Sequence, residues 1–403
     1  MPFVAIICEY NPFHNGHEYQ IKKIREEFGK DTTIIAIMSG NYTQRGETAI
    51  LDKLTRAECA VECGANLVLE LPFPYSVSSA ELFAGAAVHI ADSLGVVEYL
   101  SFGSECGSIE ELTSYAENCL SKEYSELLSR NIASDELSSL GYAKICEATY
   151  KELYGENSVP LRPNNILALE YIKALRRRKS NIKPHTIKRV GADYDEKRIT
   201  DGSIQSASAI RERVLSGDIS ALEHIPDAAK PIILGAIAEG QFPCDMERLA
   251  VAVISTLRLS PADASDNIHD VSGGLYNRLR SASFKANTIK ELVSLTETKK
   301  YTNARIFRAI WYSYLGVTSS DVKEAPEYTQ LLAMDRQGRA CLKEIGKRSS
   351  IPILTKPSRH SELSDKGRRQ KALSDRADSV FQLTKPEPPS GSFSLTFTPF
   401  VKK

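Results

Sequence analysis

The chain has 403 residues, 42% of them hydrophobic and 25% charged, and its 51 basic and 51 acidic side chains give a formal net charge of zero. This length predicts two or three domains, and the balanced charge argues against a protein devoted wholly to coating nucleic acid. No apolar run approaches the roughly 20 residues that span a bilayer, and no secretion signal precedes the first strand, so we expect a cytoplasmic protein without a membrane partner.

The first part of the chain alternates short apolar runs with helical patterns. Helices are expected to begin near residues 16, 49 and 78, each after an apolar run. The runs read as buried parallel strands over residues 3–8, 33–38, 66–71 and 96–102. This alternation predicts an α/β fold, with a doubly wound parallel sheet of Rossmann type covered by helices.

The pattern changes further along the chain. Polar helical segments fill residues 108–148, another helix opens at Pro163, and a late strand at 186–190 is expected to return to the sheet. From about residue 216 helix dominates, without a clear strand repeat. We therefore predict an α/β domain over residues 1–215, a mostly helical domain over 216–360 and a partly mobile C-terminal extension over 361–403.

The clearest motif is the run from Glu9 to His17, directly after the first strand. Open α/β sheets bind ligands at the carboxyl ends of their strands, where helices begin. His14 and His17 are three residues apart at a helix N-terminus, so both can face a phosphate attracted by the free N–H groups there. Gly16 lets the backbone come close to a ligand. The motif therefore predicts a nucleotide phosphate site rather than two unrelated histidines in a turn.

A second motif lies about 190 residues later, at Ser206–Arg211. Two hydroxyls at a helix start can donate to phosphate oxygens, and an arginine adds a bidentate cation. Alone, this segment would be an ordinary serine N-cap. Together with the histidine motif it is typical of a second phosphate-binding element. The predicted catalytic residues are His14, His17, Ser206, Ser208 and Arg211.

Two basic segments stand out against the neutral average charge. One is a compact arginine run, and the other, Thr298–Arg308, interleaves basic side chains with Tyr301 and Phe307. Either could be a solvated helix face, but basic and stacking side chains together are what RNA binding uses. The predicted RNA-binding residues are Arg176, Arg177, Arg178, Lys299, Lys300, Arg305 and Arg308.

These motifs resemble those of the bacterial tRNA(Met) cytidine acetate ligase family, within the HxGH nucleotidyl-transferase superfamily. The matches are dense over the first 215 residues and thinner beyond them. They occur in the family's order, over residues 9–17, 38–47, 69–73, 102–105, 163–167 and 206–211.

The resemblance implies an activity and its substrates. Members of that family activate acetate with ATP to give acetyl-adenylate and pyrophosphate, then transfer acetyl to N4 of the wobble cytidine of elongator tRNA(Met). Mg²⁺ is expected to accompany the ATP, although no dedicated carboxylate cage is visible in the sequence. The implied ATP contacts are Ile7, Cys8, Glu9, Tyr10, Asn11, Pro12, Phe13, His14, Asn15, Gly16, His17, Glu18, Tyr19, Gln20, Gly103, Asn165 and Arg189.

The loop after the second strand is expected to lie at the same edge of the sheet as His14. It contains Asn41, Gln44 and Arg45, which we predict to line the acetate or cytidine pocket. The chain departs from the family in the motif usually read as Glu-Gly-Leu-Glu-Asn-Arg, because Gly273 and Tyr276 replace its two acidic residues. Where the family usually has arginine, this chain has Lys300. These changes concern the grip on tRNA and leave adenylation untouched.

Two alternatives remain open from the sequence. One is a small-molecule adenylyl transferase that makes a dinucleotide cofactor, although such compact enzymes do not need a long helical C-terminal half. The other is a nucleotide-responsive RNA-binding protein that has lost catalysis. No KMSKS-like segment is present to indicate a class I aminoacyl-tRNA synthetase.

Overall fold

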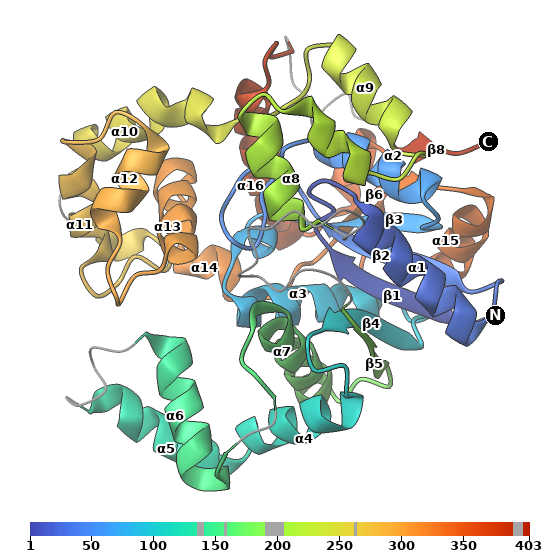
Figure 1. The fold of residues 1–403 in the computed structure, drawn as a ribbon, viewed down its shortest axis with the longest axis horizontal. Helices are drawn as coiled ribbons and strands as arrows, with labels where there is room; N and C mark the ends of the chain where they lie inside the picture. The colour runs from blue at the N-terminus through green and yellow to red at the C-terminus, as the bar shows by residue number, and fades with distance from the viewer. Residues whose placement is uncertain (135–140, 157–158, 190–204, 262–263, 390–397) are drawn as a thin grey trace.

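A single sheet organises the molecule (Figure 1). The computed structural model describes residues 1–134, 141–156, 159–189, 205–261, 264–389 and 398–403. Its eight-stranded sheet has the order β5-β4-β1-β2-β3-β6-β7, with β8 also paired to β6. Strands β1 to β5 pair in parallel with one another, β6 is antiparallel to β3, and β7 and β8 are parallel to β6. The strands are β1 (Phe3–Cys8), β2 (Thr33–Ser39), β3 (Leu67–Leu71), β4 (Tyr99–Ser104), β5 (Lys183–Lys188), β6 (Thr329–Met334), β7 (Ile353–Leu354) and β8 (Phe400–Val401).

Both faces of the sheet are buried, as the continuous apolar strands require. Successive side chains of a strand point to opposite faces, so Val4 and Ile6 of β1 join one core, and Ala5 and Ile7 join another. The first face is covered by α1 (Asn15–Phe28), α2 (Lys53–Glu62), α8 (Ala207–Leu215) and α9 (Lys230–Ala238). The second is covered by α3 (Ala80–Ser93), α4 (Ile109–Cys119), α7 (Pro163–Arg178) and α15 (Arg336–Arg348). Helices α5 (Lys122–Ala133) and α6 (Tyr142–Tyr154) project beyond α4 (Figure 1).

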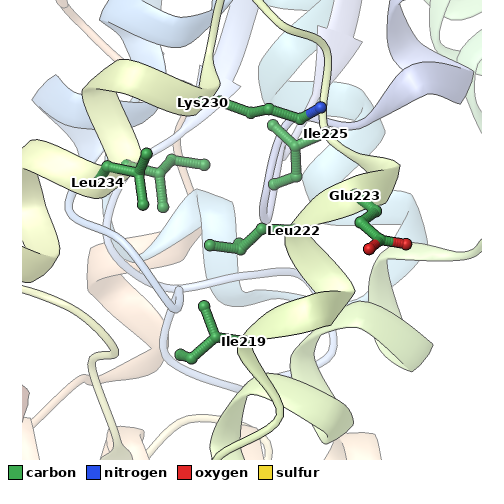
Figure 2. A pocket seen from close by; sticks show the side chains of 7 residues that line it. Ile219, Leu222, Glu223, Ile225, Lys230 and Leu234 are labelled. Carbon is green, nitrogen blue, oxygen red and sulfur yellow. The ribbon is translucent and has the colours of Figure 1, made fainter.

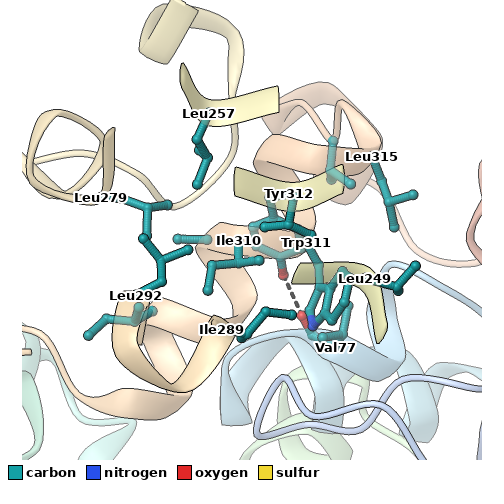
Figure 3. Close-up of a cluster of buried hydrophobic side chains, with 14 of the residues drawn as sticks. Val77, Leu249, Leu257, Leu279, Ile289, Leu292, Ile310, Trp311, Tyr312 and Leu315 are labelled. Carbon is teal, nitrogen blue, oxygen red and sulfur yellow. Dashed lines mark hydrogen bonds between the residues drawn. The ribbon is translucent and has the colours of Figure 1, made fainter. Parts of the chain in front are cut away.

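The helical region has a core of its own, which Figure 3 shows. Trp311 is fully buried in that core. The hydroxyl of Tyr312 donates to the carbonyl of Val77 at 2.6 Å, which joins this region to the segment between β3 and α3. Leu373 and Phe381 bring a later helix into the same core. The helices are α10 (Ala250–Leu259), α11 (Leu275–Ser283), α12 (Ile289–Thr296), α13 (Asn303–Leu315), the short α14 (Ser319–Val322) and α16 (Asp365–Phe381).

The predicted fold class is confirmed, since a mainly parallel sheet with helices on both faces is followed by a mostly helical region. Strands β6, β7 and β8 were not predicted, and they return the chain to the sheet from beyond residue 328. The predicted boundary at residue 360 therefore separates β6 from β8, although these strands pair in one sheet. Helix α16, within the predicted extension, is packed into the helical core, while residues 390–397 of that extension and Val190 of the predicted late strand lie outside the described residues.

Among the described residues, no helix combines the length and the apolar composition needed to cross a membrane.

Candidate active site

The sheet order fixes where a ligand can bind. Strand β1 lies between β2 on one side and β4 on the other, so the connections leaving these strands diverge to opposite sides of β1. The place where the connections diverge is the switch point of the sheet. In open α/β sheets a crevice forms there, outside the carboxyl ends of the strands. The β1–α1 turn and the end of β4 border this crevice. It is the place at which the histidine motif was predicted to act.

The two motif histidines are locked by the first turn of α1. His14 is the N-cap of the helix, and its Nδ1 accepts the N–H of Gly16 at 3.0 Å. The Nδ1 of His17 accepts the N–H of His14 at 3.2 Å, and the two ring centroids are 3.8 Å apart. A neutral imidazole has one donor and one acceptor nitrogen. Because Nδ1 accepts in both rings, Nε2 must carry the proton, which makes each ring a hydrogen-bond donor.

The surroundings keep both rings neutral. Burial, followed by the positive charges of Arg189, Arg211 and His224, lowers the pKa of His14 to about 3. Burial, with His14 and Arg189, lowers the pKa of His17 well below its ordinary value. The histidines are therefore neutral donors near pH 7, and the cationic charge beside them comes from arginine. Neutral donors and fixed cations together suit a phosphate whose charge increases during reaction.

The second motif meets the first, although they are far apart in sequence. Ser206 is the N-cap of α8, and its hydroxyl accepts the N–H of Ala209 at 3.2 Å. Arg211 donates from Nη1 to the carbonyl of Asn11 at 2.9 Å, and its Nη2 lies 3.3 Å from the hydroxyl of Ser208. The guanidinium of Arg211 is therefore bound to the backbone of the histidine motif. Three of the predicted catalytic residues, His14, His17 and Arg211, come together at the switch point.

The end of β4 meets the end of β5 on the other side of the switch point. A Cβ on Gly103 would lie 3.3 Å from Cγ of Arg189, so glycine lets this exposed arginine cross the end of β4. The Nη1 of Arg189 is 3.4 Å from Oδ1 of Asn164. These positions agree with the predicted role of Gly103 and Arg189 beside a nucleotide, which stays a prediction.

Asn165 is fully buried, and its side-chain amide forms hydrogen bonds with backbone groups of the protein. Its Oδ1 accepts the backbone N–H groups of Glu105 and Cys106 at 2.9 and 3.3 Å, and its Nδ2 donates to the carbonyl of Pro160 at 2.8 Å. Asn165 therefore holds the loop after β4 against the start of α7. Its predicted contact with ATP stays a prediction, but these bonds favour a structural role.

The loop after β2 is more firmly bound than a pocket lining requires. Asn41 is 1% exposed, and its amide donates to Asp378 at 2.8 Å and accepts the N–H of Lys53 at 2.8 Å. The side chain of Gln44 donates to the carbonyl of Ser78 at 3.2 Å. The side chains of Asn41 and Gln44 thus hold the loop in place. The predicted acetate or cytidine pocket at Asn41, Gln44 and Arg45 stays untested.

Arg56 is a buried residue that the sequence did not reveal. Its Nη1 donates to the carbonyls of Glu9 at 2.6 Å and Ser39 at 3.2 Å, its Nη2 donates to Gly40, and its Nε donates to Leu51 at 2.9 Å. These bonds tie the ends of β1 and β2 together behind the histidine motif. The sequence shows only a lone arginine within the helix expected to begin near residue 49, and such a residue is more often solvated.

The arginine run at the end of α7 is paired within the protein. These side chains are partly exposed, and each faces a carboxylate of a neighbouring helix: Arg176 with Glu117 at 2.9 Å, Arg177 with Glu81 at 2.6 Å, and Arg178 with Asp92 at 3.1 Å. The charge of the run is therefore largely balanced locally, which weakens its predicted attraction for RNA.

The second basic segment divides into a buried part and an exposed part. Arg308 is 8% exposed and lies 3.6 Å from Asp270, which also pairs with Arg305 at 3.1 Å. Tyr301 is 6% exposed, and its hydroxyl donates to the carbonyl of Gly273. The burial of Arg308 beside Asp270 disfavours its predicted contact with RNA, which stays a prediction. The burial of Tyr301 likewise disfavours stacking of its ring on a base.

Lys299 and Lys300 remain exposed in that segment. The ammonium of Lys300 lies 5.6 Å from the centroid of the Tyr301 ring. Tyr276, which occupies an acidic position of the family motif, is 1% exposed in the helical core. Its substitution therefore concerns packing and not direct contact with RNA.

Within the described residues, neither a set of metal ligands nor the apolar cavity beside α9 lies at the histidine motif. Among the described residues, no group of three or more histidine, cysteine or carboxylate side chains is arranged to hold a metal ion. An apolar cavity of 310 Å³ lies between the 3-10 helix η2 (Ile219–His224) and α9, and Figure 2 shows side chains that line it. It is lined by Ile219, Leu222, Glu223, Ile225, Lys230, Ile233 and Leu234, which lie outside both motifs.

The fold and the geometry of the site define a nucleotidyl transferase. A family model described as HIGH Nucleotidyl Transferase matches residues 1–393, so the chain belongs to that family. The tRNA(Met) cytidine acetate ligase of Thermoanaerobacter sp. (strain X514) is 39% identical over 370 residues, which cover 90% of each chain. The enzyme of the same name from Acetivibrio thermocellus is 37% identical over 374 residues, covering 89% of each. The chain belongs to the tRNA(Met) cytidine acetate ligase family, as the motif resemblance indicated.

Solved structures agree with this assignment. The apo crystal structure of Thermotoga maritima TmcAL superposes with a TM-score of 0.92 at 30% identity, covering 100% of this chain and 99% of the other. The crystal structure of the same protein bound with alpha-thio ATP superposes with a TM-score of 0.91, also at 30% identity and covering 100% of both chains.

Proposed function

We propose that this protein ligates acetate to N4 of the wobble cytidine of elongator tRNA(Met), using ATP and an acetyl-adenylate intermediate. The observation that carries the proposal is the meeting of His14, His17 and Arg211 at the switch point of the sheet. Support also comes from the names of the relatives and from the ATP analogue bound by the Thermotoga maritima protein. ATP, tRNA and acetate are all available in the cytoplasm, where we place the reaction.

In the first step a carboxylate oxygen of acetate attacks the α-phosphorus of ATP. The new P–O bond forms as the bond to the pyrophosphate oxygen breaks, and negative charge increases on the phosphate oxygens and the leaving group. In this proposal the Nε2–H groups of His14 and His17 donate to that phosphate without adding charge of their own. Arg211 and Arg189 supply the positive charge, and the positive end of the α1 helix dipole adds to it.

In the second step the exocyclic amine of cytidine attacks the carbonyl carbon of acetyl-adenylate. The C–N bond forms as the acyl C–O bond of the mixed anhydride breaks, AMP leaves with that electron pair, and the proton of the amine passes to solvent. The protein's part is to hold the two reactants at reacting distance. The base must leave any helical stack to enter the site, which an anticodon-loop base does at low cost.

A magnesium ion would accompany the nucleotide and would not occupy a site built by this chain. The carboxylates nearest the motifs already serve other groups: Glu9 accepts the N–H of Gln44 at 2.8 Å, and Glu105 accepts the N–H of Asn165 at 2.7 Å. Mg²⁺ is commonly held by substrate phosphates and water, with few protein ligands.

The tRNA would lie against the helical region. Lys299 and Lys300 are the best placed of the predicted RNA contacts, because both are exposed. Arg305 forms an ion pair with Asp270. The arginines from Arg176 to Arg178 must break their ion pairs with carboxylates before they can bind a phosphate.

The test is pyrophosphate release from ATP with and without acetate and bulk tRNA, followed by nucleoside analysis of the tRNA. Acetate-dependent release with new N4-acetylcytidine is the expected result, and both should fall by about 10²–10³-fold in His14→Ala. ATP consumption that requires a nucleotide-like substrate and not acetate would favour a cofactor-making adenylyl transferase. Nucleotide binding without turnover would favour a non-catalytic RNA-binding protein.

A further inference from the structure

Arg211 is held by two partners from different parts of the chain. Its Nη1 donates to the carbonyl of Asn11, and its Nη2 lies 2.7 Å from Oε2 of Glu47. Glu47 belongs to the loop after β2, whereas Arg211 lies on α8. The guanidinium is therefore fixed at both ends of its fork, which sets its direction toward the histidine motif.

The loop that carries Glu47 is itself tightly folded. The N–H of Thr43 donates to the carbonyl of Glu47 at 3.0 Å, and the N–H of Gly46 donates to the carbonyl of Thr43 at 2.9 Å. The backbone N–H of Gln44 donates to the carboxylate of Glu9 at 2.8 Å, which joins the loop to the first motif. The position of the Glu47 backbone is therefore set by the nucleotide site itself.

The helical region also holds this loop. The indole N–H of Trp311 on α13 donates to the carbonyl of Gly46 at 2.5 Å. A Cβ at Gly46 would lie 2.5 Å from Cβ of Phe307, and the φ angle of Gly46 is +86°, so only glycine fits this contact. The neighbour of Glu47 is thus pressed against the helical region, and the adenylation site has a support outside the α/β domain.

We propose that Glu47 is a positioning residue for adenylation, acting through Arg211. This inference rests on the proposed function, since it assigns Arg211 to the charge that develops on ATP. The pair is partly exposed, with 15% of the Arg211 side chain and 35% of the Glu47 side chain accessible. Ion pairs of this kind contribute little to folding, so the pair's expected contribution is the direction of the guanidinium.

The experiment is acetate-dependent exchange of pyrophosphate into ATP, measured without tRNA for the full chain and its variants. Glu47→Gln should lower kcat roughly 10- to 100-fold, because misplacing a catalytic group by about 1 Å costs this much. The KM for acetate and the thermal midpoint should remain close to those of the wild type. In an Arg211→Ala background, Glu47→Gln should cause no additional loss, since its effect passes through that arginine.

A matched control breaks another ion pair on the same helix. Arg213 of α8 lies 2.7 Å from Asp218, whose side chain is 42% exposed. Asp218→Asn should leave the exchange rate unchanged. Wild-type kcat in Glu47→Gln, or a full further loss when it is added to Arg211→Ala, would overturn the positioning role. Absence of exchange in the wild type would overturn the proposed function and this inference with it.

Discussion

The histidines at the carboxyl edge of the sheet and the arginines at the end of α7 differ in how far the protein itself occupies their hydrogen-bonding groups. His14 and His17 use Nδ1 for local hydrogen bonds, and these bonds leave Nε2–H as a donor for a ligand. Each arginine of α7 instead faces a carboxylate of a neighbouring helix. A ligand site is therefore recognised by polar groups that the fold holds in place without using fully. The local density of charge is a poorer guide.

A buried charge with two opposite charges as partners should be costly to disturb. Lys53 is 2% exposed, and its ammonium lies 2.7 Å from Glu70 and 2.5 Å from Asp378. Lys53→Met should lower the free energy of unfolding by about 3–5 kcal/mol, because two buried carboxylates lose their cation. Urea unfolding would measure this loss. Lys22→Met, which breaks an exposed pair with Glu18, should change stability by less than about 1 kcal/mol. Equal losses of stability in the two variants would show that burial does not determine how much each ion pair contributes.

The opposite case is His14, whose value should lie in catalysis. His14→Ala should lower acetate-dependent pyrophosphate exchange by about 10²–10³-fold, as loss of one preorganised donor does in other sites. It should also lower stability by about 1 kcal/mol, because the N-cap of α1 is lost.

His14→Asn separates these two effects. Asparagine is a good N-cap and can still accept the N–H of Gly16, but it does not place a donor where Nε2 lies. Its stability should therefore approach that of the wild type while its exchange rate stays low. High activity in this variant would show that His14 acts only as a cap.

Some of these features could be predicted from the sequence, and the reason is locality. Buried parallel strands are continuous apolar runs, so β1 to β4 were visible, and the histidine motif lies within a single turn. The pair of Glu47 with Arg211 spans 164 residues and depends on how α8 returns to the sheet. Arg56 was invisible for the same reason, because its partners are main-chain carbonyls of three segments. Strand β6 is a short apolar run within a helical region, and periodicity cannot distinguish such a run from a buried helix.

The low pKa of His14 gives a third test of the comparison between the buried histidines and the paired arginines of α7. It is about 3 in the folded protein, against an ordinary value of 6.5, so between these values the unfolded chain binds a proton that the folded chain does not. The free energy of unfolding should therefore be highest above pH 6.5 and fall as the pH is lowered, by up to about 1.4 kcal/mol per pH unit for this group. Denaturant unfolding between pH 7 and pH 4 should show a shallower slope for His14→Asn than for the wild type. Identical slopes would contradict a neutral, buried His14.

The smallest expected effect concerns the two basic segments and sharpens the contrast most directly. Lys299→Ala with Lys300→Ala should weaken tRNA binding a few-fold and reduce the salt slope by roughly two, since each phosphate contact contributes about one. Arg176→Ala with Arg177→Ala should change both less, because each guanidinium must first leave a carboxylate. Filter binding at several salt concentrations measures both quantities, and exchange without tRNA should stay at the wild-type rate in both double variants. A larger effect of the α7 arginines would mean that surface pairing, worth about 0–1 kcal/mol, does not hold them back from RNA. Charge density would then be the better guide to the tRNA surface, even though it is not the better guide to the nucleotide site.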